Sequence, residues 1–261
     1  MTITAKIIKD SISEDNNRVT TFELEYPRYI HSELLTHRVF SRNCASSRAI
    51  PIETQIQLCL DNPVKPEFTL NQKGMQGAPA DRELRQEAQR IWDLACSQAI
   101  IFARELANLG IHKQNANRLL EPFQHMKTIL TGTDFDNFFN LRIDEAAQPE
   151  IYLLAYKMKE AMEESKPTVL KEGQWHLPYV DEVLDLDFAK KTSVACCAQV
   201  SYRKCDNSEE KVESIYNRLI NSGKLHASPF EHVCTPMYRG EKQRGNLRGW
   251  YQFRSDIEDL I

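Results

Sequence analysis

The sequence predicts an α+β fold in which helices predominate and pack around a small, mostly antiparallel sheet. Two segments near the N-terminus alternate polar and apolar residues, which is the pattern of half-buried strands. Further along, residues 81–109 carry apolar side chains at helical spacing. The chain has 261 residues, of which 41% are apolar and 27% charged, so it can bury a full core as one large domain or two small ones.

The predicted strands lie at residues 3–9 and 19–26, and Asp15 to Asn17 supply the turn between them. The second strand alternates apolar and acidic side chains in the order Phe22, Glu23, Leu24, Glu25 and Tyr26. We expect one sheet that combines these strands with strands from the C-terminal part of the chain.

A first helix is predicted from Tyr29, because the apolar residues change to helical spacing there. The C-terminal end of this helix carries His37 and Arg38. Residues 61–80 contain three prolines and two glycines, so they are predicted to form a long surface loop. Such loops sometimes serve as lids.

The long helix over 81–109 is expected to begin at an Asp81 cap and to end at Gly110. Its apolar stripe, which we expect to belong to the core, consists of Leu84, Ala88, Ile91, Trp92, Leu94 and Ala95. Four shorter helices are predicted at residues 113–121, 134–142, 149–164 and 208–222. Asn207 and Glu210 form a capping pattern ahead of the last of these, and Gly223 ends it.

The amino-acid composition limits the kinds of partner and the cellular compartment that we expect for this protein. The net charge of −4 and a pI near 6.0 argue against a nonspecific nucleic-acid binder, which would usually be basic. The seven cysteines show no paired Cys-x-x-Cys spacing, so we expect reduced thiols and no metal site. No apolar run has the length of a signal peptide or a membrane span, so we expect a cytoplasmic protein without a membrane partner.

The best indication of function is the segment 36–48, THRVFSRNCASSR, which holds one histidine, three arginines and three serines. His37 can change charge near neutral pH, Arg38 offers a guanidinium fork, and Ser46 follows after seven residues with a hydroxyl. This mixture suits a ligand that carries phosphate. Taken alone, the segment is equally well interpreted as a basic helix end that meets water or surface carboxylates.

The same segment resembles the signature of the flavin-dependent thymidylate synthases, the ThyX family, in which Arg-His-Arg is followed by seven residues and Ser. NFFNLRIDEAAQPEI at 137–151 and NRLLEP at 117–122 are similar to two further family segments. AQVSYRK at 198–204 and HASPFEH at 226–232 resemble segments that ordinary members carry ahead of the signature.

This order of segments implies a circularly permuted ThyX-like fold. The resemblance implies one catalytic domain over 1–261, in which 1–189 carries the signature and 190–261 the moved segment. Permutation is physically permitted because domain termini often lie close together. The moved segment, from about Lys190 to Cys234, should then pair with the strand 19–26 and bring His226 close to His37.

The resemblance implies reductive methylation of dUMP at C5 to give dTMP. Methylenetetrahydrofolate would donate the carbon, FAD would be the cofactor, and NADPH would reduce it; family members are homotetramers with sites at subunit interfaces. Two other functions stay open. One is an enzyme that methylates or hydroxymethylates another pyrimidine nucleotide, such as dCMP, and the other is a noncatalytic nucleotide- or flavin-binding protein.

Site residues follow from the resemblance, position by position. Arg142 matches the arginine that contacts the pyrimidine, where a permanent cation would stabilise an enolate-like ring, and Ser46 is the second residue assigned to catalysis. Substrate binding is assigned to Glu33, Ser46, Ser47, Arg48, Arg118 and Arg142. Cofactor binding is assigned to His37, Arg38, Asn43, Asn137, Ser201, His226, Ser228 and Glu231. For a single arginine the competing interpretation is a surface ion pair, and for a single histidine a structural role.

Several positions depart from the family pattern, and together they remove charge from the site. Thr36 replaces the first arginine of the signature, Cys44 a glutamate, Ser47 a glycine and Ala146 a histidine. We expect the tail residues Arg248, Gln252 and Arg254 to be candidates that restore polar character. Cys44 could be a nucleophile, since nearby arginines favour a thiolate, or a plain small residue in a tight turn.

Overall fold

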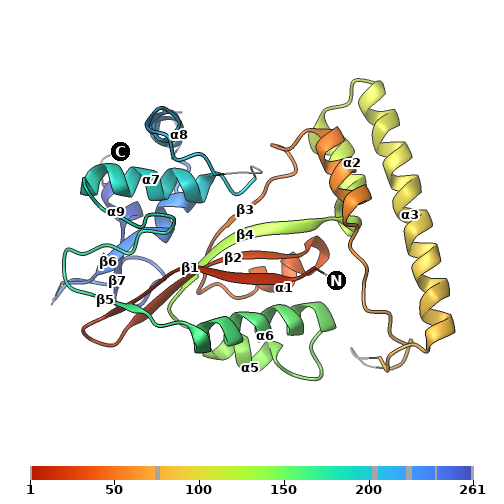
Figure 1. Ribbon diagram of the computed structural model, residues 1–261, viewed down its shortest axis with the longest axis horizontal. Coiled ribbons are helices and arrows are strands. Elements are labelled where there is room, and N and C mark those ends of the chain that lie inside the picture. Colours follow the sequence, from red (N-terminus) through yellow and green to blue (C-terminus); the bar gives the residue numbers. More distant parts are fainter. Residues whose placement is uncertain (1, 74–76, 202–204, 222–224, 239, 260–261) are drawn as a thin grey trace.

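The computed structural model describes residues 2–73, 77–201, 205–221, 225–238 and 240–259. A central sheet is covered on one face by α5 (Asp136–Arg142) and α6 (Pro149–Glu164). In Figure 1, α2 (Ile52–Asp61) and α3 (Arg82–Asn108) stand at one end of this sheet, and the C-terminal helices lie at the other. The predicted α+β class is confirmed.

The central sheet has five strands in the order β3-β4-β2-β1-β5. Their bounds are Thr4–Ser13 for β1, Arg18–Pro27 for β2, Ser41–Cys44 for β3, His125–Gly132 for β4 and Thr168–Leu170 for β5. Each pairing is antiparallel except the one between β1 and β5. The predicted hairpin is confirmed, and its turn places Asn16 at a φ of 61°.

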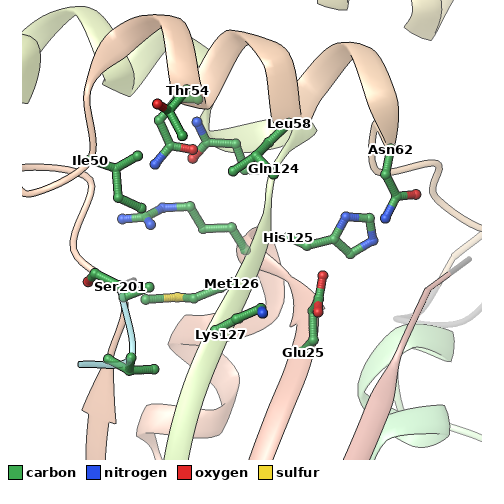
Figure 2. Close-up of a pocket in the computed structure, with 14 residues that line it drawn as sticks. Glu25, Ile50, Thr54, Leu58, Asn62, Gln124, His125, Met126, Lys127 and Ser201 are labelled. Carbon is green, nitrogen blue, oxygen red and sulfur yellow. The ribbon is translucent and has the colours of Figure 1, made fainter. Parts of the chain in front are cut away.

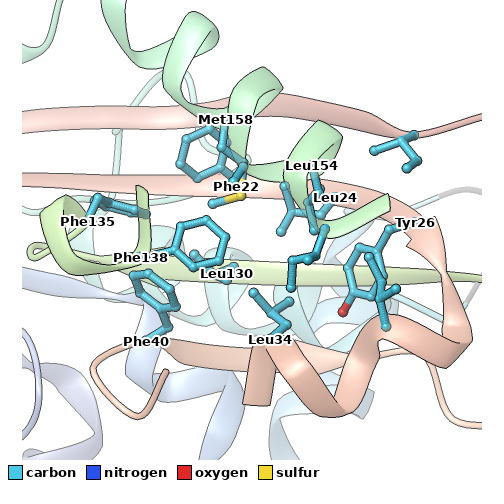
Figure 3. Close-up of a cluster of buried hydrophobic side chains, with 14 of the residues drawn as sticks. Phe22, Leu24, Tyr26, Leu34, Phe40, Leu130, Phe135, Phe138, Leu154 and Met158 are labelled. Carbon is cyan, nitrogen blue, oxygen red and sulfur yellow. The ribbon is translucent and has the colours of Figure 1, made fainter. Parts of the chain in front are cut away.

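The core confirms the alternation predicted for the second strand. Phe22, Leu24 and Tyr26 of β2 are fully buried on the face that α5 and α6 cover (Figure 3). From α6, the residues that enter this core recur at helical spacing, namely Ile151, Leu154, Ala155 and Met158. Burial of each large side chain stabilises the fold by about 1.5–3 kcal/mol, so this face anchors the elements that carry the candidate site.

The first predicted helix is short. It consists of a 3₁₀ turn, η1 (Arg28–Ile30), and α1 (His31–Leu35), which ends just before the signature. The helical spacing predicts Ile30, Leu34 and Leu35 on one face; Ile30 and Leu34 are fully buried, whereas Leu35 is 42% exposed.

The long helix α3 has the predicted limits, since the Asp81 side chain accepts a hydrogen bond from Leu84 N and Gly110 follows at a φ of 77°. The predicted core face was mostly wrong, since of its six residues only Trp92 packs against the buried cluster beside α3. The buried residues of α3 are Cys96, Ile100 and Ala103, while Leu84, Ile91 and Leu94 are exposed. The helix packs through its C-terminal half against α2 and η2 (Asn117–Phe123), so much of its apolar stripe is exposed in the described part of the chain.

The segment 61–80 is irregular over its described residues, as predicted, but it is not a free lid. Trp92 Nε1 donates to Val64 O at 2.8 Å, and Glu67 N donates to Glu150 Oε1 at 2.9 Å. Val64 itself is fully buried. The loop is therefore fixed to α3 and α6 at its first half.

Other predictions match closely. Helices α4 (Lys113–Ala116) and η2 cover the predicted 113–121, and both α5 and α6 occur where expected. Strands β3 and β4 were not predicted. The predicted end of the last helix at Gly223 lies outside the described residues; that helix, α8, spans Glu209–Asn221.

The C-terminal part of the chain, from α7 (Leu186–Ala198) to α9 (Phe253–Glu258), forms a group of elements that we call the C-terminal module. Between these two helices it contains α8, η3 (Ser228–His232), β6 (Cys234–Pro236) and β7 (Trp250–Gln252). Strands β6 and β7 pair with each other in a separate sheet, so the expectation of one sheet shared by both ends of the chain was wrong. The moved segment does not pair with β2 either, since β1 and β4 flank that strand. Instead, η3 packs against β3.

A buried polar chain ties this module to the central sheet. Ser11, His176, Thr21, Thr131 and His232 are linked in that order by hydrogen bonds of 2.9, 2.8, 2.7 and 2.8 Å. Burial lowers the pKa of each histidine to about 3, so both imidazoles are neutral.

In Figure 1 the start of β1 lies at the end of the central sheet that faces α2 and α3, whereas α9 lies at the other end beside α7. Within the described residues, none of the helices has the length and apolarity that crossing a lipid bilayer requires.

Candidate functional site

Arg142 lies in the last turn of α5 and reaches back to the segment that ends α1. Its guanidinium donates to Glu33 Oε2 at 2.9 Å, to His37 Nε2 at 3.0 Å and to Thr36 Oγ1 at 3.2 Å. We call these four residues the arginine cluster. Three residues that the sequence assigned to substrate or cofactor are thus in direct contact, although they lie up to 109 positions apart.

His37 acts as an acceptor in this cluster. Burial lowers the pKa of His37 below its usual range, and the charges of Arg142 and Arg42 lower it further. The ring is therefore neutral, with the proton on Nδ1 and the Nε2 lone pair facing Arg142. Edge-to-face packing on Phe138, at 4.9 Å between ring centroids, fixes its orientation. The guanidinium of Arg142 forms an ion pair with Glu33.

Arg42 was not assigned a role from the sequence, yet it joins β3 to the end of α1. Its Nη1 donates to Leu34 O and His37 O, both at 3.3 Å. These carbonyls belong to a helix end, where unpaired acceptors favour a cation. Arg42 therefore holds His37 in place from the strand side.

The second group of predicted residues lies at the other end of β3. Ser46, Ser47 and Arg48, here called the phosphate-side loop, follow that strand directly. Ser46 N donates to Ser201 Oγ at 3.0 Å, and Ser46 Oγ accepts from Arg48 N at 3.3 Å. The signature and the C-terminal segment are therefore in direct contact at this point.

Asn43 provides a second contact of this kind. Its Nδ2 donates to Cys197 O at 2.5 Å, and its Oδ1 accepts from Ser228 Oγ at 3.3 Å. Asn43 and Ser228 were both assigned to the cofactor, and here they bind each other.

Arg118 is brought next to the phosphate-side loop by its neighbour. The buried side chain of Asn117 donates to Ser47 O at 2.7 Å and to Ile50 O at 3.0 Å. Arg118 itself is 60% exposed and pairs with Glu121 at 2.9 Å. Asn117 stands in the quoted NRLLEP motif, so its position was a usable signal that we did not assign.

The remaining predicted residues fall into two states. Four of them are exposed, namely Arg38, Arg48, Asn137 and His226. In the described part of the chain, the guanidinium groups of Arg38 and Arg48 do not pair with a carboxylate. Glu231 is instead engaged by Arg254. The tail arginines do not add charge to the arginine cluster, because Arg248 pairs with Asp134 at 2.6 Å and Arg254 also binds Glu258.

Cys44 does not have the environment of a nucleophile. Burial raises the pKa of its thiol, and the hydrogen bond to Thr128 and the charges of Arg42 and Arg28 offset this only in part. Cys44 also lies in β3 opposite Thr128, in a strand and not in a tight turn. It is a protonated packing residue at neutral pH.

A cavity of about 140 Å³ lies between α2 and the start of β4 (Figure 2). Ile50 and Ser201 line one end, and Glu25, Asn62 and His125 line the other. Burial lowers the pKa of His125, so this ring is neutral as well. The cavity borders the phosphate-side loop through Ser201. Among the described residues, no three histidine, cysteine or acidic side chains gather as a metal site would require.

Comparison with solved structures defines the class of fold. A UMP/dUMP methylase, PolB, from Streptomyces cacaoi, solved with 5-Br UMP, superposes with a TM-score of 0.50 over 62% of this chain and 88% of that one. Because the two sequences are 17% identical, this likeness concerns the fold alone.

The family is shown by sequence. Residues 16–168 match the family model of the thymidylate synthase complementing proteins, and the chain belongs to that family. A flavin-dependent thymidylate synthase from Pyrococcus furiosus is 29% identical over 145 residues, 54% of this chain and 53% of that protein. Another from Pyrococcus abyssi is 28% identical over 155 residues, 57% of each chain. The chain thus spans about half the length of the curated relatives it matches.

Proposed function

We propose that this protein is a flavin-dependent thymidylate synthase that methylates dUMP at C5, with methylenetetrahydrofolate and NADPH as co-substrates. The observation that carries the proposal is the arginine cluster, in which a permanent cation, a neutral imidazole and a carboxylate meet at one end of β3. The phosphate-side loop and Arg118 lie at the other end. The four residues of β3 span about 13 Å, a length comparable with that of a nucleoside monophosphate.

In this proposal each residue has a distinct task. Arg142 stabilises negative charge on the carbonyls of the enolate-like uracil ring whose C5 attacks the carbon donor. Glu33 holds Arg142 and can accept a hydrogen bond from the base. Ser46, Arg48 and Arg118 bind the phosphate, which fixes the base against Arg142.

The chain offers suitable groups for FAD. Arg38, Asn137 and His226 are exposed donors and would hold the cofactor, with Arg38 suited to its diphosphate. When bound and reduced, the flavin supplies the hydride. Asn43, Ser201 and Ser228 would support this site by fixing its walls, since they bind other parts of the chain. Glu231 would need to release Arg254 to contact the cofactor.

We also propose that residues 1–189 and 190–261 form one catalytic unit with permuted chain order. Support comes from the contacts of Ser201 and Ser228 with the signature, which join the moved segment to it. The family match ends at residue 168, so the C-terminal module lies outside it.

A homotetramer is part of the same proposal. The unpartnered face of α3 exposes Ile91, Leu94 and Phe102 by 55%, 52% and 51%. Exposed apolar surface of this extent on one helix favours burial by another copy of the chain.

The proposal is tested by the visible spectrum of the purified protein, by FAD titration, and by an assay for conversion of dUMP to dTMP. We expect a yellow protein that takes up FAD and requires both co-substrates. A colourless protein that takes up no added FAD would contradict the proposal. Light scattering tests the tetramer, which a fully active monomer would rule out.

A further inference from the structure

The C-terminal tail contains two amide side chains that bind the signature segment. Asn246 Nδ2 donates to Val39 O at 2.8 Å, and its Oδ1 accepts from Ser41 Oγ at 3.1 Å. Gln252 Nε2 donates to the same Ser41 Oγ at 3.2 Å. Both contacts bridge more than 200 positions in sequence. The tail therefore holds the stretch that separates His37 and Arg38 from β3.

The hydrogen bonds form one satisfied network. Ser41 Oγ donates once and accepts once, while Gln252 donates its second N–H to Glu231 O at 2.9 Å and accepts from Asn246 N at 3.3 Å. Ser41 and Gln252 are 1% and 2% exposed. Loss of one partner would leave buried groups unpaired, which costs more than the bond itself contributes.

A glycine in the tail is required for this approach. Gly245 has a φ of 131°, and a Cβ at this position would lie 2.0 Å from Gln252 Oε1. Any other residue would therefore push Gln252 away from Ser41, and it would also be strained in the backbone.

The network acts on an edge strand. β3 pairs with β4 on one side, and among the described residues its other edge is not paired with a strand. Ser41 and Asn43, two residues apart, point to the same face, and both bind the C-terminal module. On the opposite face, Arg42 binds the end of α1. Side-chain contacts with the module therefore set where β3 lies, and with it the two ends of the candidate site.

We infer that Asn246 and Gln252 are positioning residues that fix residues 37–44 of the signature for flavin binding. The part of this inference that concerns the flavin rests on the proposed function. The part that concerns the position of the segment does not.

The test compares Asn246→Ala with Arg244→Ala, a neighbouring variant whose exposed guanidinium pairs with Asp259 and does not touch the signature. Hydrogen exchange of the peptide that spans 37–44 reports the position of the segment, and FAD titration reports its use. We expect about tenfold faster exchange and about tenfold weaker FAD binding in Asn246→Ala. Arg244→Ala should match the wild type in both measurements, and thermal melting should show that both variants are folded.

Each outcome decides a separate point. Exchange and FAD affinity equal to those of Arg244→Ala would overturn the inference, and faster exchange with unchanged affinity would overturn its flavin part. If the wild type takes up no FAD, the proposed function fails, while the exchange measurement still decides the positioning role. Should Asn246→Ala not fold, Asn246→Asp replaces it, because it keeps the oxygen for Ser41 and loses the donor to Val39.

Discussion

The arginine cluster and the phosphate-side loop are held at opposite ends of β3 in different ways. The arginine cluster is partly buried, and its residues come from α1, the turn after it and α5, all within the first 142 positions. The phosphate-side loop is open, and it is fixed by Ser201 from the C-terminal module and by Asn117. The residues that meet at the first end therefore all lie within the first 142 positions, whereas the second end takes one of its hydrogen-bond partners directly from the C-terminal module.

The largest effect on these two ends of the site is expected from removal of the C-terminal module. A chain that ends at residue 189 loses His232, the partner of Thr131, and the partners of Ser41 and Ser46. It also exposes the edge of β3. We expect no stable folding and no FAD binding, measured by circular dichroism and flavin absorbance. Coexpression of 190–261 should restore both, and a soluble 1–189 fragment that still bound FAD would show that the module is dispensable.

A second variant changes the arginine cluster alone. Arg142→Ala removes the cation that would stabilise the transition state, so turnover of dUMP should fall by about 10²–10³ fold. The fold and FAD content should remain, because Arg142 is at the end of α5 and not in the core. Arg104→Ala, which removes an exposed pair with Glu53, is the control. Activity within a few-fold of the wild type would exclude Arg142 from the site.

The link between module and sheet should make stability depend on pH. Burial lowers the pKa of His176 and His232 to about 3, below the ordinary value of 6.5. Between these values the unfolded state binds more protons, so the stabilising effect is present above pH 6.5 and is lost as pH falls toward 3. In this range, each histidine lowers the free energy of unfolding by about 1.4 kcal/mol for every unit by which the pH falls.

Urea unfolding at pH 7.5 and 5.5 measures this effect, and the midpoint should be lower at pH 5.5. His232→Gln should reduce the difference between the two midpoints. Equal midpoints in the wild type would mean that these histidines are not neutral in the folded protein.

The smallest effect is expected at Cys44. Because burial raises the pKa of its thiol, Cys44→Ser should leave turnover within a few-fold of the wild type. The steady-state rate constant decides this point, with Cys59→Ser, a buried cysteine away from β3, as the control. A loss of more than about a hundredfold in Cys44→Ser alone would restore the nucleophile hypothesis.

Local patterns in the sequence determined a large part of this protein. The alternation at Phe22, Leu24 and Tyr26 identified β2, and the capping residue and helical spacing identified α3 and α6, because these signals act over a few residues. The family resemblance pointed to three of the residues that meet in the arginine cluster, namely Glu33, His37 and Arg142. β4 was missed because its last five residues are all buried, so no alternation marks the strand.

Tertiary structure decided what depends on the partners of a residue. The apolar stripe of α3 predicted a buried face, but α2 and η2 cover a different set of α3 residues. The periodicity of α3 does not encode where α2 and η2 will lie. The pairing of Glu33 with Arg142 and the contacts of Ser41 with Asn246 and Gln252 join residues more than 100 positions apart. The first contact forms where α5 meets α1 and the others where the β3 edge meets the C-terminal module, and a pattern along the chain cannot predict which elements will meet.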